Sequence, residues 1–173
     1  MNLDFEYGEG SSFALCGIFD APRETAFKAW TEAERLGKWW GPKGMPIRVA
    51  RLDPRPGGMF LYAMRRPDGD EMWGRFVYRE VVAPERLVFL SSFSNEQGEI
   101  TRAPFFDGGW PLEVLNTVTF ADRGGKTLLS LRGVSHEATA EERKTFEGGR
   151  DSMKGGFTGT MEQLESYLKG AKS

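Results

Sequence analysis

Residues 139–169, TAEERKTFEGGRDSMKGGFTGTMEQLESYLK, predict one long amphipathic helix. Thr139 and Glu142 form a capping box at its start, and Gly170 stands where glycine commonly ends a helix. The apolar side chains recur mostly at steps of three or four, which places them on one face of the helix. They are Phe146, Met153, Phe157, Met161, Leu164 and Leu168.

The glycine content of this helix calls for an explanation, because each glycine in a helix interior costs about 1 kcal/mol relative to alanine. One interpretation is a kink near Gly148 and Gly149, with the helix backbone packed closely on a sheet. The other is that small residues leave space for a guest molecule between helix and sheet. The glycines concerned are Gly148, Gly149, Gly155, Gly156 and Gly159.

The rest of the chain predicts mainly strands. Residues 1–10 are expected to form a flexible N-terminal arm and residues 11–19 the first strand. Pro22 suits the first turn of a helix that runs to about Trp30, and Thr31 with Glu34 predicts a second capping box that opens a short helix. Six strands separated by turn residues are then expected at residues 47–53, 59–66, 71–82, 86–93, 112–120 and 126–135.

The order is therefore strand, helix, helix, six strands, helix, which predicts an α+β fold in a single domain over residues 11–170. Strands that follow one another through tight turns favour a twisted antiparallel sheet, and the C-terminal helix could cover its concave face. Residues 94–111 form a predicted loop whose length is typical of lids and binding loops.

Composition argues against several classes of function. The 23 basic and 25 acidic residues nearly balance, so neither a nucleic-acid partner nor an anionic membrane partner is expected. Cys16 and His136 are single, which excludes an internal disulfide and argues against a metal site, and no cofactor is expected. No apolar run reaches the length of a membrane span, and the acidic N-terminal residues do not resemble a signal peptide, so we expect a cytoplasmic protein.

The candidate binding residues are large apolar side chains that the sheet and the last helix would present to each other. Alternating aromatic residues on paired strands are explained by ordinary sheet packing or, on a concave face, by a pocket. Of Trp39 and Trp40, one is expected in the core and the other at its rim or in a cavity wall. The candidates are Trp39, Trp40, Phe60, Tyr62, Phe76, Tyr78, Phe93, Trp110, Met153, Phe157 and Met161.

Catalytic signals are weak. His136 at a strand end is expected to make a local hydrogen bond, or else to act as an acid or base together with Tyr62 or Tyr78. Ser135 and Cys16 lack the local signature of an activated nucleophile. We therefore assign no catalytic residue, and a binding protein is favoured over an enzyme.

Five short motifs, in this order, resemble the AHSA-type family of the START-like superfamily, named after activators of a heat-shock chaperone ATPase. The resemblance implies the helix-grip fold, in which a curved antiparallel sheet wraps a long C-terminal helix and encloses a cavity. In many relatives this cavity holds an apolar small molecule. The motifs are Ala21-Pro22-Arg23-Glu24 continuing to Trp30, Trp39-Trp40-Gly41-Pro42, Arg55-Pro56-Gly57-Gly58, Pro84-Glu85-Arg86-Leu87, and Gly156-Phe157.

Three functional hypotheses follow. The first is a small-molecule-binding domain that holds an apolar, aromatic or lipid-like ligand between sheet and helix. The second, implied by the family name, is a stress protein linked to a chaperone ATPase, and the third is an enzyme of the cyclase or hydratase type found among START-like relatives. The edges of the sheet could also pair two chains into a homodimer.

Overall fold

The computed structural model describes residues 2–8 and 11–171, and over these ranges the chain forms an eight-stranded antiparallel sheet and four α-helices. The strands are β1 (Asp4–Gly8), β2 (Ser12–Phe19), β3 (Ile47–Leu52), β4 (Met59–Arg65), β5 (Glu71–Val82), β6 (Arg86–Ser94), β7 (Glu113–Arg123) and β8 (Lys126–His136). Their order across the sheet is β1-β2-β8-β7-β6-β5-β4-β3. Only the β2–β8 pairing joins strands distant in sequence, because every other neighbouring pair is consecutive along the chain.

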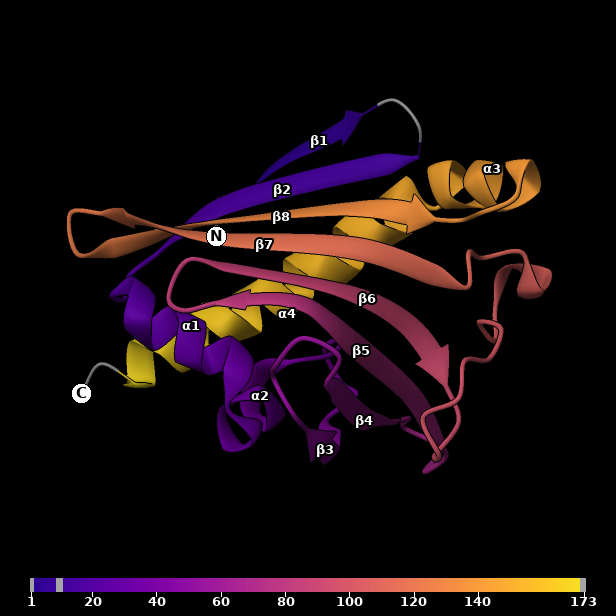
Figure 1. Cartoon of the computed structure of the whole chain (residues 1–173), viewed down its shortest axis with the longest axis horizontal. Helices are drawn as coiled ribbons and strands as arrows, with labels where there is room; N and C mark the ends of the chain where they lie inside the picture. The colour runs from indigo at the N-terminus through magenta and orange to yellow at the C-terminus, as the bar shows by residue number, and fades with distance from the viewer. Residues whose placement is uncertain (1, 9–10, 172–173) are drawn as a thin grey trace.

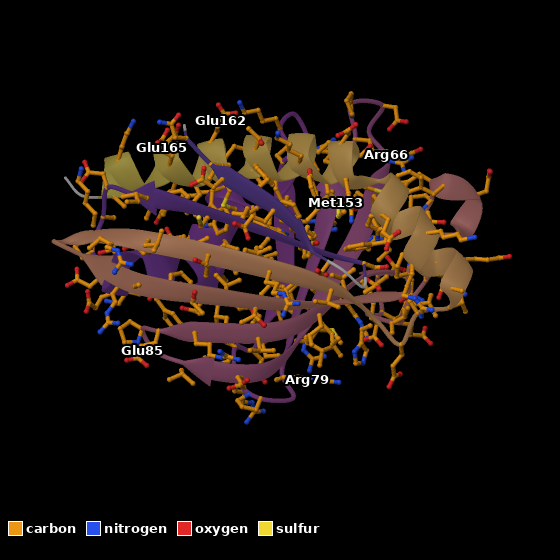
Figure 2. The ribbon with its side chains drawn as sticks, turned by 90° about the horizontal axis from the view of Figure 1, so that it is seen from above. Arg66, Arg79, Glu85, Met153, Glu162 and Glu165 are labelled. Atoms are coloured by element: carbon orange, nitrogen blue, oxygen red, sulfur yellow. The ribbon has the colours of Figure 1, made fainter. Side chains whose placement is uncertain are left out.

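The helices lie on one face of the sheet and at its ends (Figure 1). The long helix α4 (Arg150–Ala171) crosses behind the strands, with α1 (Arg23–Thr31) and α2 (Ala33–Trp39) near its C-terminal end and α3 (Ala140–Gly148) before its N-terminus. Met153 of α4 lies between helix and sheet, whereas Glu162 and Glu165 lie on the side turned away from the strands (Figure 2). This arrangement is the predicted α+β helix-grip fold.

The amphipathic pattern of the last segment is confirmed, and the glycine pair divides it into two helices. Thr139 Oγ1 accepts a hydrogen bond from the Glu142 backbone N–H, while the Glu142 carboxylate accepts one from the Thr139 N–H, so the predicted capping box is present. α3 ends at Gly148 and α4 begins at Arg150, with Gly149 between them. The predicted kink near Gly148 and Gly149 is therefore confirmed.

Two local predictions are wrong. Part of the expected flexible arm, Asp4–Gly8, is strand β1, which pairs antiparallel with β2 at the edge of the sheet. Thr31 does not open a capping box: it is the last residue of α1, and its hydroxyl donates to the Phe27 carbonyl at 3.0 Å. Glu32 instead precedes α2 and makes no side-chain cap.

The loop between β6 and β7 has two parts, which contact opposite sides of the sheet. Its first part turns back over the outer face, where Gly98 stands against Met59 and Leu61 and its carbonyl accepts a hydrogen bond from Arg75 at 2.7 Å. Its second part contains the short 3-10 helix η1 (Phe106–Gly108) and packs against α3, where Trp110 contacts Phe146. The loop therefore covers part of the outer face of β4 and β5, whereas the main core lies on the inner face.

The core fills the half of the inner face that lies beneath α1, α2 and the C-terminal half of α4. Trp30 of α1 and Trp39 of α2 are almost completely buried there, with ring centroids 4.8 Å apart. Leu164 and Leu168 of α4 complete this packing, and both are buried. Among the described residues, no helix combines the length and hydropathy required to cross a membrane.

Candidate functional site

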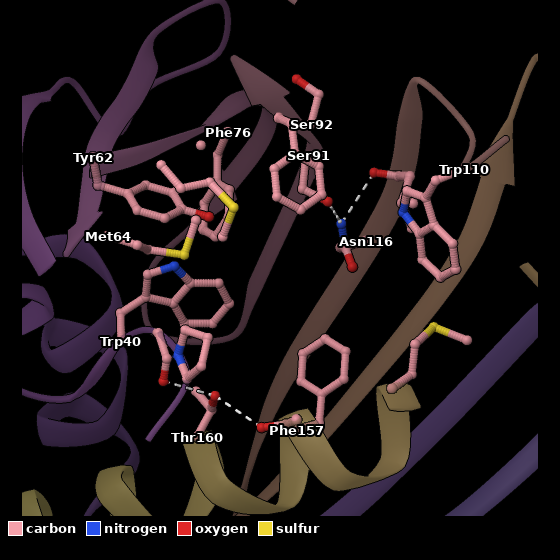
Figure 3. Close-up of a pocket in the computed structure, with 18 of the residues that line it drawn as sticks. Trp40, Tyr62, Met64, Phe76, Ser91, Ser92, Trp110, Asn116, Phe157 and Thr160 are labelled. Atoms are coloured by element: carbon pink, nitrogen blue, oxygen red, sulfur yellow. Dashed lines mark hydrogen bonds between the residues drawn. The ribbon is translucent and has the colours of Figure 1, made fainter. Parts of the chain in front are cut away.

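A cavity of about 320 Å³ lies in the other half of the fold, between the inner face of β4 to β8 and the N-terminal half of α4 (Figure 3). Three of its lining residues are solvent-exposed: Pro42 after α2, Phe105 in the β6–β7 loop and Gly156 in α4. The cavity therefore opens between these three segments. Among the described residues that line it, none is Asp, Glu, Lys, Arg or His.

Seven of the eleven candidate residues line this cavity, and four do not. The seven come from the α2–β3 turn, β4, β5, β6, the β6–β7 loop and α4, so the fold brings together residues from across the chain. They are Trp40, Tyr62, Phe76, Phe93, Trp110, Met153 and Phe157. The other four are buried in the packed half of the core, where the first helices fill the space over the sheet: Trp39, Phe60, Tyr78 and Met161.

The two adjacent tryptophans separate as expected, one into the core and one into the cavity wall. Trp39 is 1% exposed and its indole N–H donates to the Ala29 carbonyl at 2.9 Å. Trp40 follows the last residue of α2, turns toward the sheet and meets the Phe76 ring edge-on at 5.1 Å. Gly41 follows with φ of 104°, a conformation that L side chains rarely adopt, so glycine is needed for the chain to turn here.

Helix α4 holds this turn with side-chain hydrogen bonds. The Gln163 amide donates to the carbonyls of Trp39 at 2.9 Å and Gly41 at 2.8 Å. The Thr160 hydroxyl lies 2.9 Å from the Gly41 carbonyl and 3.1 Å from the Gly156 carbonyl, either of which can accept its proton. The position of Trp40 is therefore fixed by the helix on the opposite side of the cavity.

Tyr62 forms a second wall because its neighbour on β5 is glycine. A Cβ at Gly74 would lie 2.5 Å from the Tyr62 hydroxyl oxygen, so only glycine lets the phenol ring cross this strand. The ring also stacks on Phe60, with centroids 4.7 Å apart. Burial raises the pKa of Tyr62 to about 12, an effect that the neighbouring Trp40 indole opposes only in part. The phenol is therefore neutral at physiological pH.

Aromatic rings form one side of the opening. Trp110 packs against Phe146 of α3 at 5.1 Å and stacks on Phe106 at 5.2 Å. A Cβ at Gly149 would come within 2.8 Å of the Trp110 ring, so the glycine between α3 and α4 allows this contact. Phe105 contacts Phe93 of β6 at 5.2 Å and is 41% exposed, which leaves it at the outer edge of the opening.

The glycines of this segment have different surroundings. The atoms nearest to a Cβ on any of them do not belong to the sheet, so the predicted close packing of the helix backbone on the sheet is not found. Gly149 lies under Trp110 at the kink, and a Cβ at Gly159 would lie 3.3 Å from the Lys43 side chain. Gly156 lines the cavity, and a Cβ there would meet no atom within 4 Å. Gly155 is equally unobstructed but does not line the cavity. The missing side chain at Gly156 thus contributes open space beside Phe157.

Sequence reasoning found Tyr62 but missed the other polar residues of the cavity. Asn116 of β7 is buried among apolar neighbours, and its Nδ2 donates to the Ser91 hydroxyl at 2.9 Å and the Val114 carbonyl at 3.0 Å. The alternation of β7 contains the signal, because Val114, Asn116 and Val118 fall on one face. An asparagine on an otherwise apolar strand face marks either a structural hydrogen bond or a binding group.

The residues proposed for acid–base chemistry do not meet in the cavity. His136 lies at the end of β8, outside the cavity lining, with Nε2 3.9 Å from the Glu137 carboxylate. Tyr78 is in the packed core, and burial raises its pKa. Tyr62 alone of the three faces the cavity, and it is a hydrogen-bond donor rather than a base.

A curved antiparallel sheet that grips a C-terminal helix, with a cavity between them, defines a helix-grip domain. The sequence matches the family model described as "Activator of Hsp90 ATPase homolog 1-like protein" over residues 20–169. The chain therefore belongs to this family, as the short motifs predicted. No protein of curated function matches the sequence significantly.

Solved structures with the same fold extend over nearly the whole chain. A protein of Mycobacterium smegmatis shares 22% identity and a TM-score of 0.79, covering 97% of this chain and 98% of its own. A protein of Arthrobacter aurescens shares 24% identity and a TM-score of 0.80, with coverage of 96% and 91%. A protein of Nitrosomonas europaea shares 25% identity and a TM-score of 0.74, with coverage of 95% and 98%.

Proposed function

We propose that this protein binds an apolar or aromatic small molecule in the cavity between the sheet and α4. The observation that carries the proposal is a cavity of about 320 Å³ whose walls are mainly aromatic, methionine and aliphatic side chains. Pockets of this size and character, with a few placed polar groups, are typical of small-molecule sites. The ligand would gain its affinity from burial of apolar surface against rings such as Trp40, Phe76 and Phe157.

The fixed walls support binding. Trp40 is held by hydrogen bonds from α4, and Tyr62 is held by its stacking on Phe60 and by the absence of a side chain at Gly74. Side chains that are already ordered lose little conformational entropy when a ligand arrives. A preformed cavity of this kind suits a binding role without any catalytic group.

The test uses the two adjacent glycines of α4 as a matched pair. We expect N-phenyl-1-naphthylamine, a neutral apolar fluorophore, to bind the unmodified protein saturably at one site. Gly156→Phe should weaken this binding at least tenfold, because the new ring would occupy the apolar cavity. Gly155→Phe places the same ring on the same helix outside the cavity, so its affinity should stay within twofold of the unmodified protein.

Fluorescence titration measures both affinities, and circular dichroism establishes that both variants fold. If the unmodified protein does not bind the fluorophore, the proposal fails. Equal weakening by the two substitutions would show that the probe binds elsewhere or that the helix has been disturbed as a whole, and this would also count against the cavity.

A further inference from the structure

Asn116, a buried polar residue in the cavity lining, indicates the chemistry of the ligand. Asn116 lies on the inner face of β7, opposite Phe89 of β6 and Gly133 of β8, and is 4% exposed. Burying an amide among apolar groups is unfavourable unless its hydrogen-bonding atoms find partners. The partners of Asn116 therefore decide what its remaining atom can do.

Both protons of the Asn116 amide are used within the protein. Nδ2 donates to the Ser91 hydroxyl at 2.9 Å and to the Val114 carbonyl at 3.0 Å. These two acceptors determine the orientation of the amide, because the reverse orientation would direct Oδ1 at the Val114 carbonyl oxygen. The side chain is thus held in one orientation without a ligand.

Oδ1 is left facing the cavity. In Figure 3 it is turned away from Ser91 toward the side where Phe157 lies. Within residues 2–8 and 11–171, Oδ1 accepts no hydrogen bond, and the amide atom that faces the Ser91 hydroxyl is Nδ2 rather than Oδ1. The cavity therefore presents a fixed acceptor on its sheet wall.

The remaining lining disfavours a charged ligand. No charged side chain is present among the described lining residues, and the one ionisable group there, the Tyr62 phenol, is neutral because burial raises its pKa to about 12. An anion would lose its hydration without gaining a cationic partner, which is costly in an apolar site. A carboxylate would in addition be repelled by Oδ1 itself.

We propose that the cavity selects neutral ligands that carry a hydroxyl or N–H donor, as phenols and alcohols do, and that Asn116 Oδ1 accepts this hydrogen bond. The inference rests on the proposed function, since it concerns the same cavity. It goes further in predicting a discrimination by chemical group: donor-bearing molecules bind better than capped analogues, and both bind better than carboxylates of the same ring system. Asn116 is thus assigned as the specificity-determining residue.

Three naphthalene probes test this assignment at pH 7: 2-naphthol carries a donor, 2-methoxynaphthalene lacks it, and 2-naphthoate is an anion. Isothermal titration of the unmodified protein should give 2-naphthol about 3- to 10-fold tighter binding than the ether, the ratio expected for one neutral hydrogen bond. The naphthoate should bind at least tenfold more weakly than 2-naphthol. These comparisons need no variant, so they do not depend on whether a substitution is tolerated.

Variants then locate the effect. Asn116→Leu, which is similar in size and lacks the acceptor, should bind 2-naphthol and the ether equally. Thr160→Val also changes a polar lining residue, but its hydroxyl is directed at backbone carbonyls, so the preference for 2-naphthol should remain. Equal binding of 2-naphthol and the ether to the unmodified protein would overturn the inference while leaving the cavity function intact. If none of the three probes binds, both proposals fail.

Discussion

Replacement of Gly149 by alanine should destabilise the protein through one contact, that between the α3–α4 junction and Trp110. The new Cβ would lie 2.8 Å from the Trp110 ring, where ordinary contacts begin at 3.4 Å. Trp110 has little freedom to retreat because Phe146, which is 1% exposed, packs against it at 5.1 Å. Overpacking of this kind costs about 1–3 kcal/mol, and the lower conformational entropy of alanine in the unfolded chain offsets up to about 1 kcal/mol of it.

The net expectation is a loss of about 1–2 kcal/mol, which lowers the melting temperature by about 2–8 °C in a chain of this length. The matched control is Gly148→Ala, because Gly148 is the preceding residue and a Cβ there meets no atom within 4 Å. That substitution should leave the melting temperature unchanged or raise it slightly. Thermal unfolding followed by circular dichroism distinguishes the two, and a Gly149→Ala variant at least as stable as Gly148→Ala would refute the reasoning.

Two further predictions concern the supports of the cavity. The hydrogen bond from Arg102, assisted by the backbone N–H of Thr139, lowers the pKa of Glu142. Because the folded-state pKa is the lower one, its stabilisation is present at neutral pH and is lost as the pH falls from about 5 through that pKa. At pH 7, Glu142→Gln should therefore unfold at a lower urea concentration than the unmodified protein, and near pH 3 the two unfolding midpoints should converge. A difference between the midpoints that stays constant with pH would contradict this explanation. Gln163→Ala removes both hydrogen bonds from α4 to the Trp40 turn. In urea unfolding it should lower the free energy of unfolding by about 1–2 kcal/mol, and it should also weaken the binding of N-phenyl-1-naphthylamine. Unchanged binding would show that the turn does not need this support.

The order of elements is predictable from sequence because each strand and helix carries its own pattern and its own turn residues. β1 is the exception: Leu3, Phe5 and Tyr7 do alternate with Asp4 and Glu6, but the pattern is short and was not recognised as a strand. Its residues are mostly exposed, and pairing with β2 holds it in the sheet. The Thr31 prediction failed for a different reason, since a hydroxyl at the end of one helix can bond backward to Phe27 as readily as forward. Local patterns therefore identify elements better than their exact ends.

The cavity was predictable only in part. Period-two alternation places Phe60, Tyr62, Phe76 and Tyr78 on one face of the sheet, but it does not say which of them the first two helices will cover. That depends on how α1 and α2 pack over the sheet, which is a matter of tertiary structure. Asn116 could have been found, because the same alternation places a polar side chain among apolar ones.

The cavity walls and its opening differ in how firmly they are held. Trp40 is fixed by α4, Tyr62 by Gly74 and Phe60, and Asn116 by its two hydrogen bonds, so the interior does not depend on a ligand for its shape. At the opening, Phe105 and Phe106 are each more than 40% exposed, and Phe106 adopts a φ of 55°, which is unfavourable for a bulky side chain. A rigid interior favours selectivity, whereas rings exposed at the edge can adjust without disturbing the core. Adjustment of the site to a ligand is therefore expected at the β6–β7 loop rather than in the sheet or in α4.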